Sequence, residues 1–318
     1  MLTRFKPNRT EHGTPTNNLA FVITTCAQNC FSQRIIGNQE VAITVMGFSK
    51  PTVFFSLAFG QALALALCVR WLGDAVLLLT MVTPLTTSLL MLLWIAPESG
   101  AARIPSLLGL TNFGLVGWPL ALGAPYGIHL LGIVALAVSG LAVFVIPNGG
   151  FGADFVLNLV AELIVGTLFA LGEEVGWRGY LLPRVSNGRS AVNAMLLVGF
   201  LHGLWHLPLI VGTPFYHPDA NLFVVIPLFM VTLTLAGIFY GFLRVWTGSV
   251  WPVAIAHGAA NGAWNIFEQS NTTKTPLVLE ILGGESGVIV IVGLGVISWW
   301  LTAVMRRPGF LARMVKVA

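Results

Sequence analysis

Two adjacent glutamates followed by an arginine are the first side chains in this sequence that could do chemistry. They stand in the segment Leu171-Gly-Glu-Glu-Val-Gly-Trp-Arg178. On a helix, Glu174 and Arg178 share a face and can pair, while Glu173 is rotated by about 100° to another face. The pattern predicts that Glu173 is free to titrate and to act as a general acid or base near neutral pH. The alternative interpretation is structural, with Arg178 reaching toward the membrane surface from a helix end.

Two histidines repeat this spacing in the segment Phe200-Leu-His-Gly-Leu-Trp-His-Leu-Pro208. His202 and His206 are four residues apart, so they lie on one helix face. Histidines at this spacing can bind Zn²⁺ together, or one can hold a water molecule while the other packs. His129 stands alone in an apolar stretch, and we interpret it as a hydrogen-bonded core residue.

His257 and Asn261 form a third pair at the same spacing, with glycine and alanine between them. Small residues allow a neighbouring helix backbone to approach closely. Imidazole and carboxamide groups both donate hydrogen bonds, so the pair could stabilise a developing oxyanion in acyl transfer. The alternative is a polar clamp between helices, and we assign Asn265, one turn later, to such a clamp.

The elements that carry these motifs are membrane helices. Of the 318 residues, 56% are hydrophobic and 9% are charged, whereas ordinary soluble domains carry roughly 25% charged residues. Crossing a bilayer takes about 20 mostly apolar residues, and the chain has long continuous apolar runs instead of period-two alternation. The predicted fold class is all-α, a polytopic transmembrane bundle of about eight helices.

Eight apolar runs are long enough to span a membrane. They are Thr52–Leu72, Val76–Ile95, Tyr126–Ile146, Phe155–Trp177, Ala191–Val211, Leu222–Leu243, Val250–Phe267 and Val288–Met305. The three motifs lie in the fourth, fifth and seventh of these runs. Each ionisable group at membrane depth costs about 2.5–3.5 kcal/mol on insertion scales. Their concentration in three helices therefore predicts that these helices surround a common polar pocket.

Membrane topology accounts for the excess of basic residues behind the net charge of +4. With eight crossings and a cytoplasmic N-terminus, only Arg70 and Lys274 of the 16 basic residues fall outside, as the positive-inside rule requires. We expect both termini in the cytoplasm and the protein in the plasma membrane. The sequence has no basic stripe with interleaved aromatics, so nucleic acid is excluded as a partner.

The chain is organised as one membrane domain between two tails. We expect residues 1–45 to be a loosely ordered cytoplasmic tail, 46–307 to be the membrane domain, and 308–318 to be a basic cytoplasmic tail. Met46, just before the first span, is a second candidate for the start of translation. Pro97 to Gly123 is expected to be an inner connection with a short helix on the membrane surface.

The three motifs in this order resemble the CPBP family, the intramembrane endopeptidases related to the CAAX prenyl protease Rce1 and to bacterial Abi proteins. The resemblance covers about residues 155–268. It implies that Glu173 and His206 activate water and that His257 and Asn261 form the oxyanion hole, with Glu174 and Arg178 in support. His202 replaces the phenylalanine that usually begins the second motif, so the family assigns it no role.

The predicted reaction is hydrolysis of a peptide bond by glutamate-activated water inside a membrane cavity. The substrate would be a membrane-associated peptide or a prenylated protein. No serine or cysteine stands beside a base, which argues against a covalent acyl-enzyme. The route needs no metal, and we favour none. A zinc ion would draw its ligands from His202, His206, His257 and Glu173.

Two other functions stay open. The first is a non-proteolytic membrane protein for binding or bacteriocin self-immunity, which would keep the polar pocket for recognition. The second is a proton-coupled transporter, because intramembrane carboxylates and histidines also build proton relays. Transporters commonly have internal repeats and broken helices, and the sequence shows neither.

Overall fold

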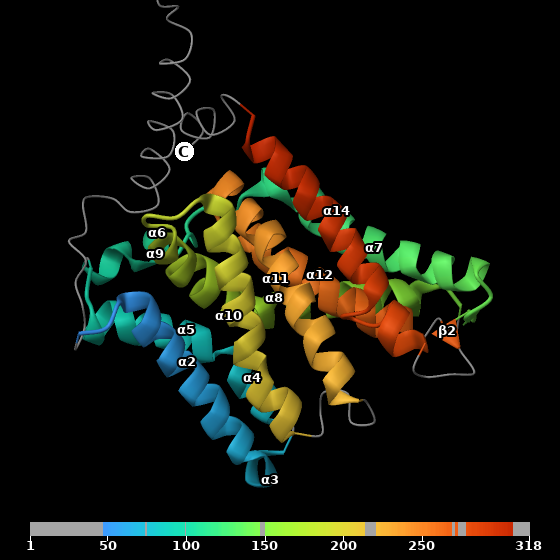
Figure 1. Cartoon of the computed structure of the whole chain (residues 1–318), viewed down its shortest axis with the longest axis horizontal. Helices are drawn as coiled ribbons and strands as arrows, with labels where there is room; N and C mark the ends of the chain where they lie inside the picture. Colours follow the sequence, from blue (N-terminus) through green and yellow to red (C-terminus); the bar gives the residue numbers. More distant parts are fainter. Residues whose placement is uncertain are drawn as a thin grey trace, which may run out of the picture.

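The chain folds into a bundle of helices (Figure 1). The computed structural model describes residues 47–73, 75–98, 100–146, 150–213, 221–268, 271–272 and 278–307. The expected tails, residues 1–45 and 308–318, and the candidate start Met46 lie outside these residues. Within the described part, the β-structure is a two-residue antiparallel pairing of β1, Val143–Phe144, with β2, Asn271–Thr272. The all-α prediction is confirmed.

Among the residues that the structure describes, seven helical segments are long and apolar enough to cross a membrane, so the protein is a multi-pass integral membrane protein. The first three are α2 (Lys50–Leu67), the run of α4 (Ala75–Met81), α5 (Thr83–Leu90) and η1 (Met91–Ile95), and η3 (Leu115–Gly117) with α7 (Trp118–Val138). The others are α8 (Ala153–Glu174) with η4 (Val175–Leu181) and α9 (Leu182–Val185), α10 (Ala191–Gly212), α11 (Leu222–Thr247), and η5 (Leu279–Gly283) with α14 (Val288–Met305). A single turn, α3 (Val69–Leu72), follows α2.

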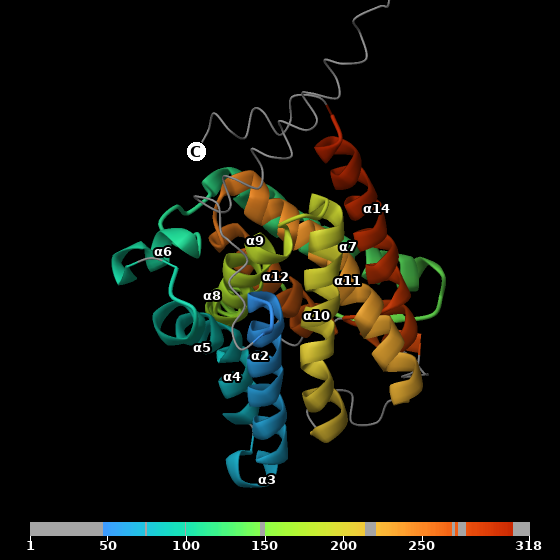
Figure 2. The ribbon, with the colours of Figure 1, turned by 60° about the vertical axis from the view of Figure 1, so that its left-hand side comes forward.

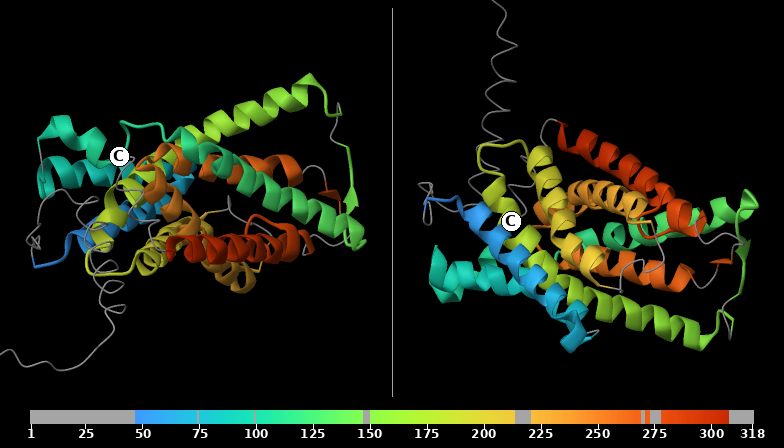
Figure 3. Two further views of the ribbon diagram at one scale, coloured as in Figure 1. Left: turned by 90° about the horizontal axis from the view of Figure 1, so that it is seen from above. Right: turned by 60° about the horizontal axis from the view of Figure 1, so that its bottom comes forward.

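The seventh predicted span corresponds to helix α12 (Trp251–Glu268), which exists but is not among these seven. It packs against α8 and α7, and in the right-hand view of Figure 3 it lies between them. Residues 252–259 are all buried. Neighbouring helices take the place of lipid around α12, so this helix tolerates the polar residues that lower its hydropathy.

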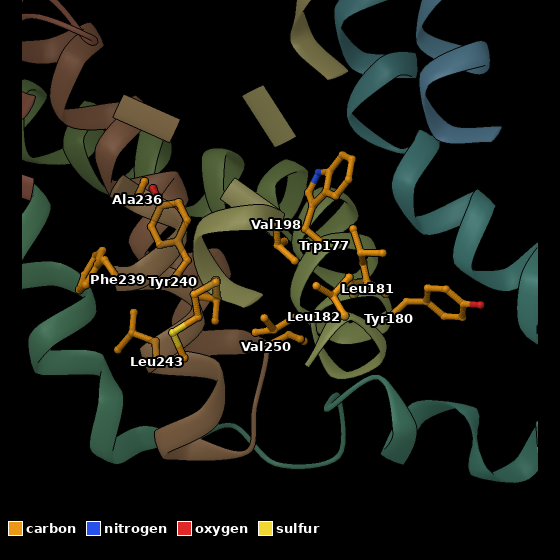
Figure 4. Close-up of a cluster of buried hydrophobic side chains, with 14 of the residues drawn as sticks. Trp177, Tyr180, Leu181, Leu182, Val198, Ala236, Phe239, Tyr240, Leu243 and Val250 are labelled. Atoms are coloured by element: carbon orange, nitrogen blue, oxygen red, sulfur yellow. The ribbon is translucent and has the colours of Figure 1, made fainter. Parts of the chain in front are cut away.

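Helices α2, α10, α11 and α14 follow one another across one side of the bundle (Figure 2). The apolar core lies where α10 and α11 meet η4 (Figure 4). Trp177 is buried in this core, and its ring contacts Phe54 of α2 edge to face, with 5.7 Å between the centroids. The core therefore holds η4, which carries Arg178 of the Glu-Glu-Arg motif, against α2 and α10.

The predicted third span, Tyr126–Ile146, is displaced by about two turns, because α7 begins at Trp118 and ends at Val138. Proline is tolerated in the first turn of a helix, where its missing N–H has no partner in any case, and Pro119 occupies that position. Pro125, just before the predicted start of the span at Tyr126, lies inside the helix. The preceding connection contains the short helices η2 (Ala101–Arg103) and α6 (Ile104–Leu107).

The predicted fourth span ends too early, because α8 continues through the π-helical segment η4 into α9. Gly176 lets α5 approach this segment closely, since a Cβ atom there would lie 2.4 Å from Cβ of Pro84 on α5. Every residue of η4 is buried. The arginine of the first motif therefore lies inside the protein, and the interpretation that Arg178 reaches the membrane surface is wrong.

Glycines set the close crossings between the motif helices. A Cβ atom on Gly258 of α12 would lie 2.4 Å from the backbone nitrogen of Thr167 on α8. On α10, a Cβ atom on Gly199 would lie 2.5 Å from the carbonyl oxygen of Leu233 on α11. The prediction that small residues next to His257 bring a neighbouring backbone close is confirmed.

A cluster of charged residues ties three helix ends together. Glu98 lies after η1, and its Oε1 accepts hydrogen bonds from Nζ of Lys50 at 3.0 Å and from Nε of Arg184 at 2.9 Å. Nη2 of Arg184 also donates to Oε2. Burial by itself would raise the pKa of Glu98, but the hydrogen bonds and charges of Arg184 and Lys50 outweigh it and hold this pKa below 4.5. The cluster joins α2, η1 and α9.

Candidate active site

Helices α8, α10 and α12 bring the three motifs together, as the concentration of polar residues in them predicted. Oε2 of Glu173 on α8 lies 2.8 Å from Nε2 of His202 on α10. Nδ1 of His257 on α12 lies 2.9 Å from Oε1 of Glu174. These groups are at most 10% exposed. Side chains from distant parts of the chain thus form one buried polar cluster.

Glu174 and Arg178 pair as their spacing predicts, with Nη1 of Arg178 3.0 Å from Oε1 of Glu174. Both side chains are fully buried. The same Nη1 atom lies 3.0 Å from Nδ1 of His202. A guanidinium Nη1 carries two hydrogens, so Arg178 can donate one to each partner. The arginine therefore links the first motif to the second.

Glu173 lies on another face of the helix, as its spacing predicts. We expected its carboxylate to be unpaired, but it has a hydrogen-bond partner. His202 occupies one of its carboxylate oxygens. The spacing along α8 gave no sign of this contact, because the partner comes from a different helix. Glu173 also lines a cavity between the helices, so it can still meet a reactant there.

His206 lines the same cavity. Its Nδ1 donates to the backbone oxygen of His202 at 3.0 Å. A neutral imidazole carries one hydrogen, so this bond leaves the lone pair on Nε2. The ring packs edge to face against Trp205 and Phe229, which holds its orientation.

His257 and Asn261 line the cavity from α12. His257 lies about 9 Å along α12 from its first residue, Trp251, because an α-helix rises 1.5 Å per residue. Its ring stacks on Tyr240 of α11, with centroids 5.5 Å apart and an angle of 21°. The guanidinium carbon of Arg178 lies 5.0 Å from the centre of the same tyrosine ring. We did not predict Tyr240, whose one signal in the sequence is a tyrosine within a strongly apolar run.

The cavity is lined by both polar and apolar side chains. The polar lining residues include Glu173, His206, His257 and Asn261, together with His129, Glu285 and Ser286. The apolar walls come from α7, α11 and α14 and include Ile128, Phe229, Leu233, Phe239, Val290 and Leu294. The site can therefore accept a polar reacting group attached to an apolar one.

His129 and Asn265 are two further polar residues whose roles were predicted from the sequence. His129 is buried, as expected of a core residue, and it lines the cavity. Asn265 donates to Oε2 of Glu162 on α8 at 3.1 Å. The predicted clamp between helices is thus confirmed for Asn265.

Three candidate zinc ligands, Glu173, His202 and His206, have ligand atoms within 4.8 Å of one another. His202 does not fit this role, because Arg178 can only donate to its Nδ1. The imidazole hydrogen then sits on Nε2, the nitrogen that faces Glu173 and would have to bind the metal. Two ligands of this group are left, whereas catalytic zinc sites have three protein ligands. We therefore derive no step through a metal.

Membrane-spanning helices around a buried cluster of carboxylates and histidines define a polytopic membrane protein with a buried polar site. Residues 153–263 match the family model described as Type II CAAX prenyl endopeptidase Rce1-like. Over this region the chain is similar to the Rce1-like family of peptidases, and the resemblance drawn from the motifs is confirmed.

Part of the chain is also similar to a curated protein. A stretch of 63 residues is 40% identical to CAAX prenyl protease 2 of Methanococcus maripaludis. This stretch covers 20% of the present chain and 22% of that protein, so the similarity spans about a fifth of the relative's length.

Proposed function

We propose that this protein is an intramembrane endopeptidase that hydrolyses a peptide bond with a water molecule activated by Glu173. One observation carries the proposal: Glu173, His206, His257 and Asn261 line a single cavity. A carboxylate, an imidazole and two groups able to donate hydrogen bonds are the parts needed for water activation and oxyanion stabilisation.

In the proposed reaction, water is held between Glu173 and Nε2 of His206. Glu173 takes a proton from the water as its oxygen attacks the carbonyl carbon. His257 and Asn261 donate hydrogen bonds to the resulting oxyanion. Glu173 then passes its proton to the leaving amine as the C–N bond breaks, which returns the carboxylate to its starting state.

His257 can donate to the oxyanion only through Nε2, because Nδ1 faces Glu174. A donor at both nitrogens requires the imidazolium form. The carboxylate of Glu174, 2.9 Å away, can balance that charge. Glu174 and Arg178 thus support the site without contacting the substrate, in agreement with the roles that the family resemblance implies.

The proposed substrate is a membrane-associated peptide, including the prenylated CAAX proteins after which the family is named. The apolar walls of the cavity favour an apolar group next to the scissile bond. We further propose that the protein lies in the plasma membrane with both termini in the cytoplasm. The charged cluster of Lys50, Glu98 and Arg184 supports one polar end of the bundle, on the side where the positive-inside rule places basic residues.

The direct test is cleavage by the purified full chain in lipid nanodiscs. The probes are an internally quenched farnesylated CAAX peptide and a panel of unmodified membrane peptides. General acid–base catalysis contributes roughly 10²–10⁴-fold, so Glu173→Gln and His206→Ala should lose at least a hundredfold in kcat. Leu209→Met serves as the control, because Leu209 is buried on the same helix but lies outside the cavity.

Equal cleavage by the wild type, Glu173→Gln and His206→Ala would refute the proposal. Binding of a peptide without cleavage by any of the proteins would favour the recognition or self-immunity function instead.

A further inference from the structure

We propose that His202 is a positioning residue, which orients the Glu173 carboxylate and joins it to the Arg178–Glu174 pair. The proposal rests on the proposed function, since it assigns a role within that site. His202 stands where the second motif usually has phenylalanine, and a phenylalanine could make neither of its two hydrogen bonds.

The neighbours of His202 determine its tautomer. Nδ1 lies 3.0 Å from Nη1 of Arg178, and Nε2 lies 2.8 Å from Oε2 of Glu173. Arginine has donors and no acceptor, so Nδ1 must accept. The single hydrogen of the neutral imidazole is therefore on Nε2 and is donated to Glu173.

A continuous chain of hydrogen bonds then crosses the site. Arg178 donates to His202, and His202 donates to Glu173. Arg178 also donates to Oε1 of Glu174, which accepts a second bond from His257. The proposed base and the proposed oxyanion donor are thus held by one network, with Arg178 at its centre.

Packing holds the His202 ring in place. The side chain is fully buried. Its ring stacks on Trp177 at 5.1 Å and tilts against Trp205 at 5.9 Å. His202 is not among the residues that line the cavity, so it does not contact the substrate. It acts on the reaction through Glu173.

The two oxygens of the Glu173 carboxylate therefore have different roles. Oε2 is held by His202, and Oε1 is the oxygen that can take a proton from water. Displacement of a catalytic group by about 1 Å can cost a hundredfold in rate. Loss of the donor also makes the carboxylate easier to protonate.

The experiment compares His202→Phe and His202→Gln in nanodiscs with the quenched farnesylated CAAX peptide. His202→Phe should lower kcat about a hundredfold with KM unchanged, and the acidic limb of the kcat/KM profile should move to higher pH. Glutamine has both a donor and an acceptor, so His202→Gln should retain kcat within about tenfold of the wild type, with an unshifted profile. Leu209→Met again controls for changes in packing on α10.

Activity and an acidic limb equal to the wild type in His202→Phe, while Glu173→Gln is inactive, would overturn the relay and leave the proposed function intact. Loss of activity in both His202 variants with an unshifted acidic limb would also overturn it, since a purely structural role predicts that result.

A second measurement needs no activity. The protein is labelled with ¹⁵N-histidine, the His202 signal is assigned by its loss in His202→Gln, and its tautomer is read from the ring nitrogen shifts. The Nε2–H tautomer is expected. The Nδ1–H tautomer would overturn the relay, even for a protein that cleaves none of the peptides.

Discussion

Nδ1 of His257 lies 2.9 Å from Oε1 of Glu174, although 83 residues separate them in the chain. The contact joins α12 to the end of α8 and places the imidazole between a carboxylate and the cavity. Because Arg178 binds the same oxygen, Glu174 is the group through which the first and third motifs are held together.

Glu174→Gln should therefore reduce stability more than Glu173→Gln does. Removing one partner of a buried ion pair leaves the other charge uncompensated, at a cost of about 3–5 kcal/mol, and here that charge is on Arg178. We expect a clearly lower Tm for Glu174→Gln in detergent micelles, and at most a small change for Glu173→Gln. Equal Tm values for the two variants would contradict this ranking.

Gly258→Ala should disrupt the crossing of α8 and α12. The added Cβ would lie 2.4 Å from the backbone nitrogen of Thr167, and a backbone cannot yield as a flexible side chain can. Overpacking typically costs about 1–3 kcal/mol, and the separation of the helices should also move His257 away from Glu174. We expect a lower Tm and a large loss of kcat.

The matched control is Gly295→Ala on α14, where a Cβ atom would have no neighbour within 4 Å. It should leave both Tm and kcat at wild-type values. If Gly258→Ala behaves in the same way, the close crossing is not needed for the site.

Glu98 should make stability depend on pH. Its pKa in the folded protein is held below 4.5 by Arg184 and Lys50. The stabilisation is therefore complete above the unfolded value, near 4.5, and is lost as the pH falls through the folded value. The difference in Tm between the wild type and Glu98→Gln should be largest near pH 7 and should shrink below about pH 4.5. A constant difference across this range would show that the carboxylate charge contributes nothing.

Metal removal should leave activity unchanged. The orientation of His202 toward Arg178 withholds one of the three ligands that a catalytic zinc site needs. Cleavage should survive dialysis against EDTA and 1,10-phenanthroline, with metal well below one equivalent by mass spectrometry. Loss of activity that returns on adding Zn²⁺, but not on adding Mg²⁺, would refute the metal-free route.

Much of the fold could be predicted because hydropathy is a local property. The helices around the motifs, such as α10 and α11, begin at the predicted residues, since apolar runs of that length have no other stable form in lipid. The errors in the predicted helix boundaries arose at prolines and glycines. Pro125 lies inside α7 and Gly176 lies within the π-helical turn, and in both places packing against neighbouring helices overrides the local preference.

For the site, spacing of four residues was enough to pair Glu174 with Arg178 and to place His257 and Asn261 on one face, because the geometry of a single helix dictates both. The partner of Glu173, the stacking of Tyr240 and the tautomer of His202 could not be read in this way. Each depends on how helices cross, and those crossings rest on contacts between distant backbones, such as Gly258 with Thr167. Local patterns decide which side chains share a helix face, whereas close packing of the whole bundle decides which faces meet.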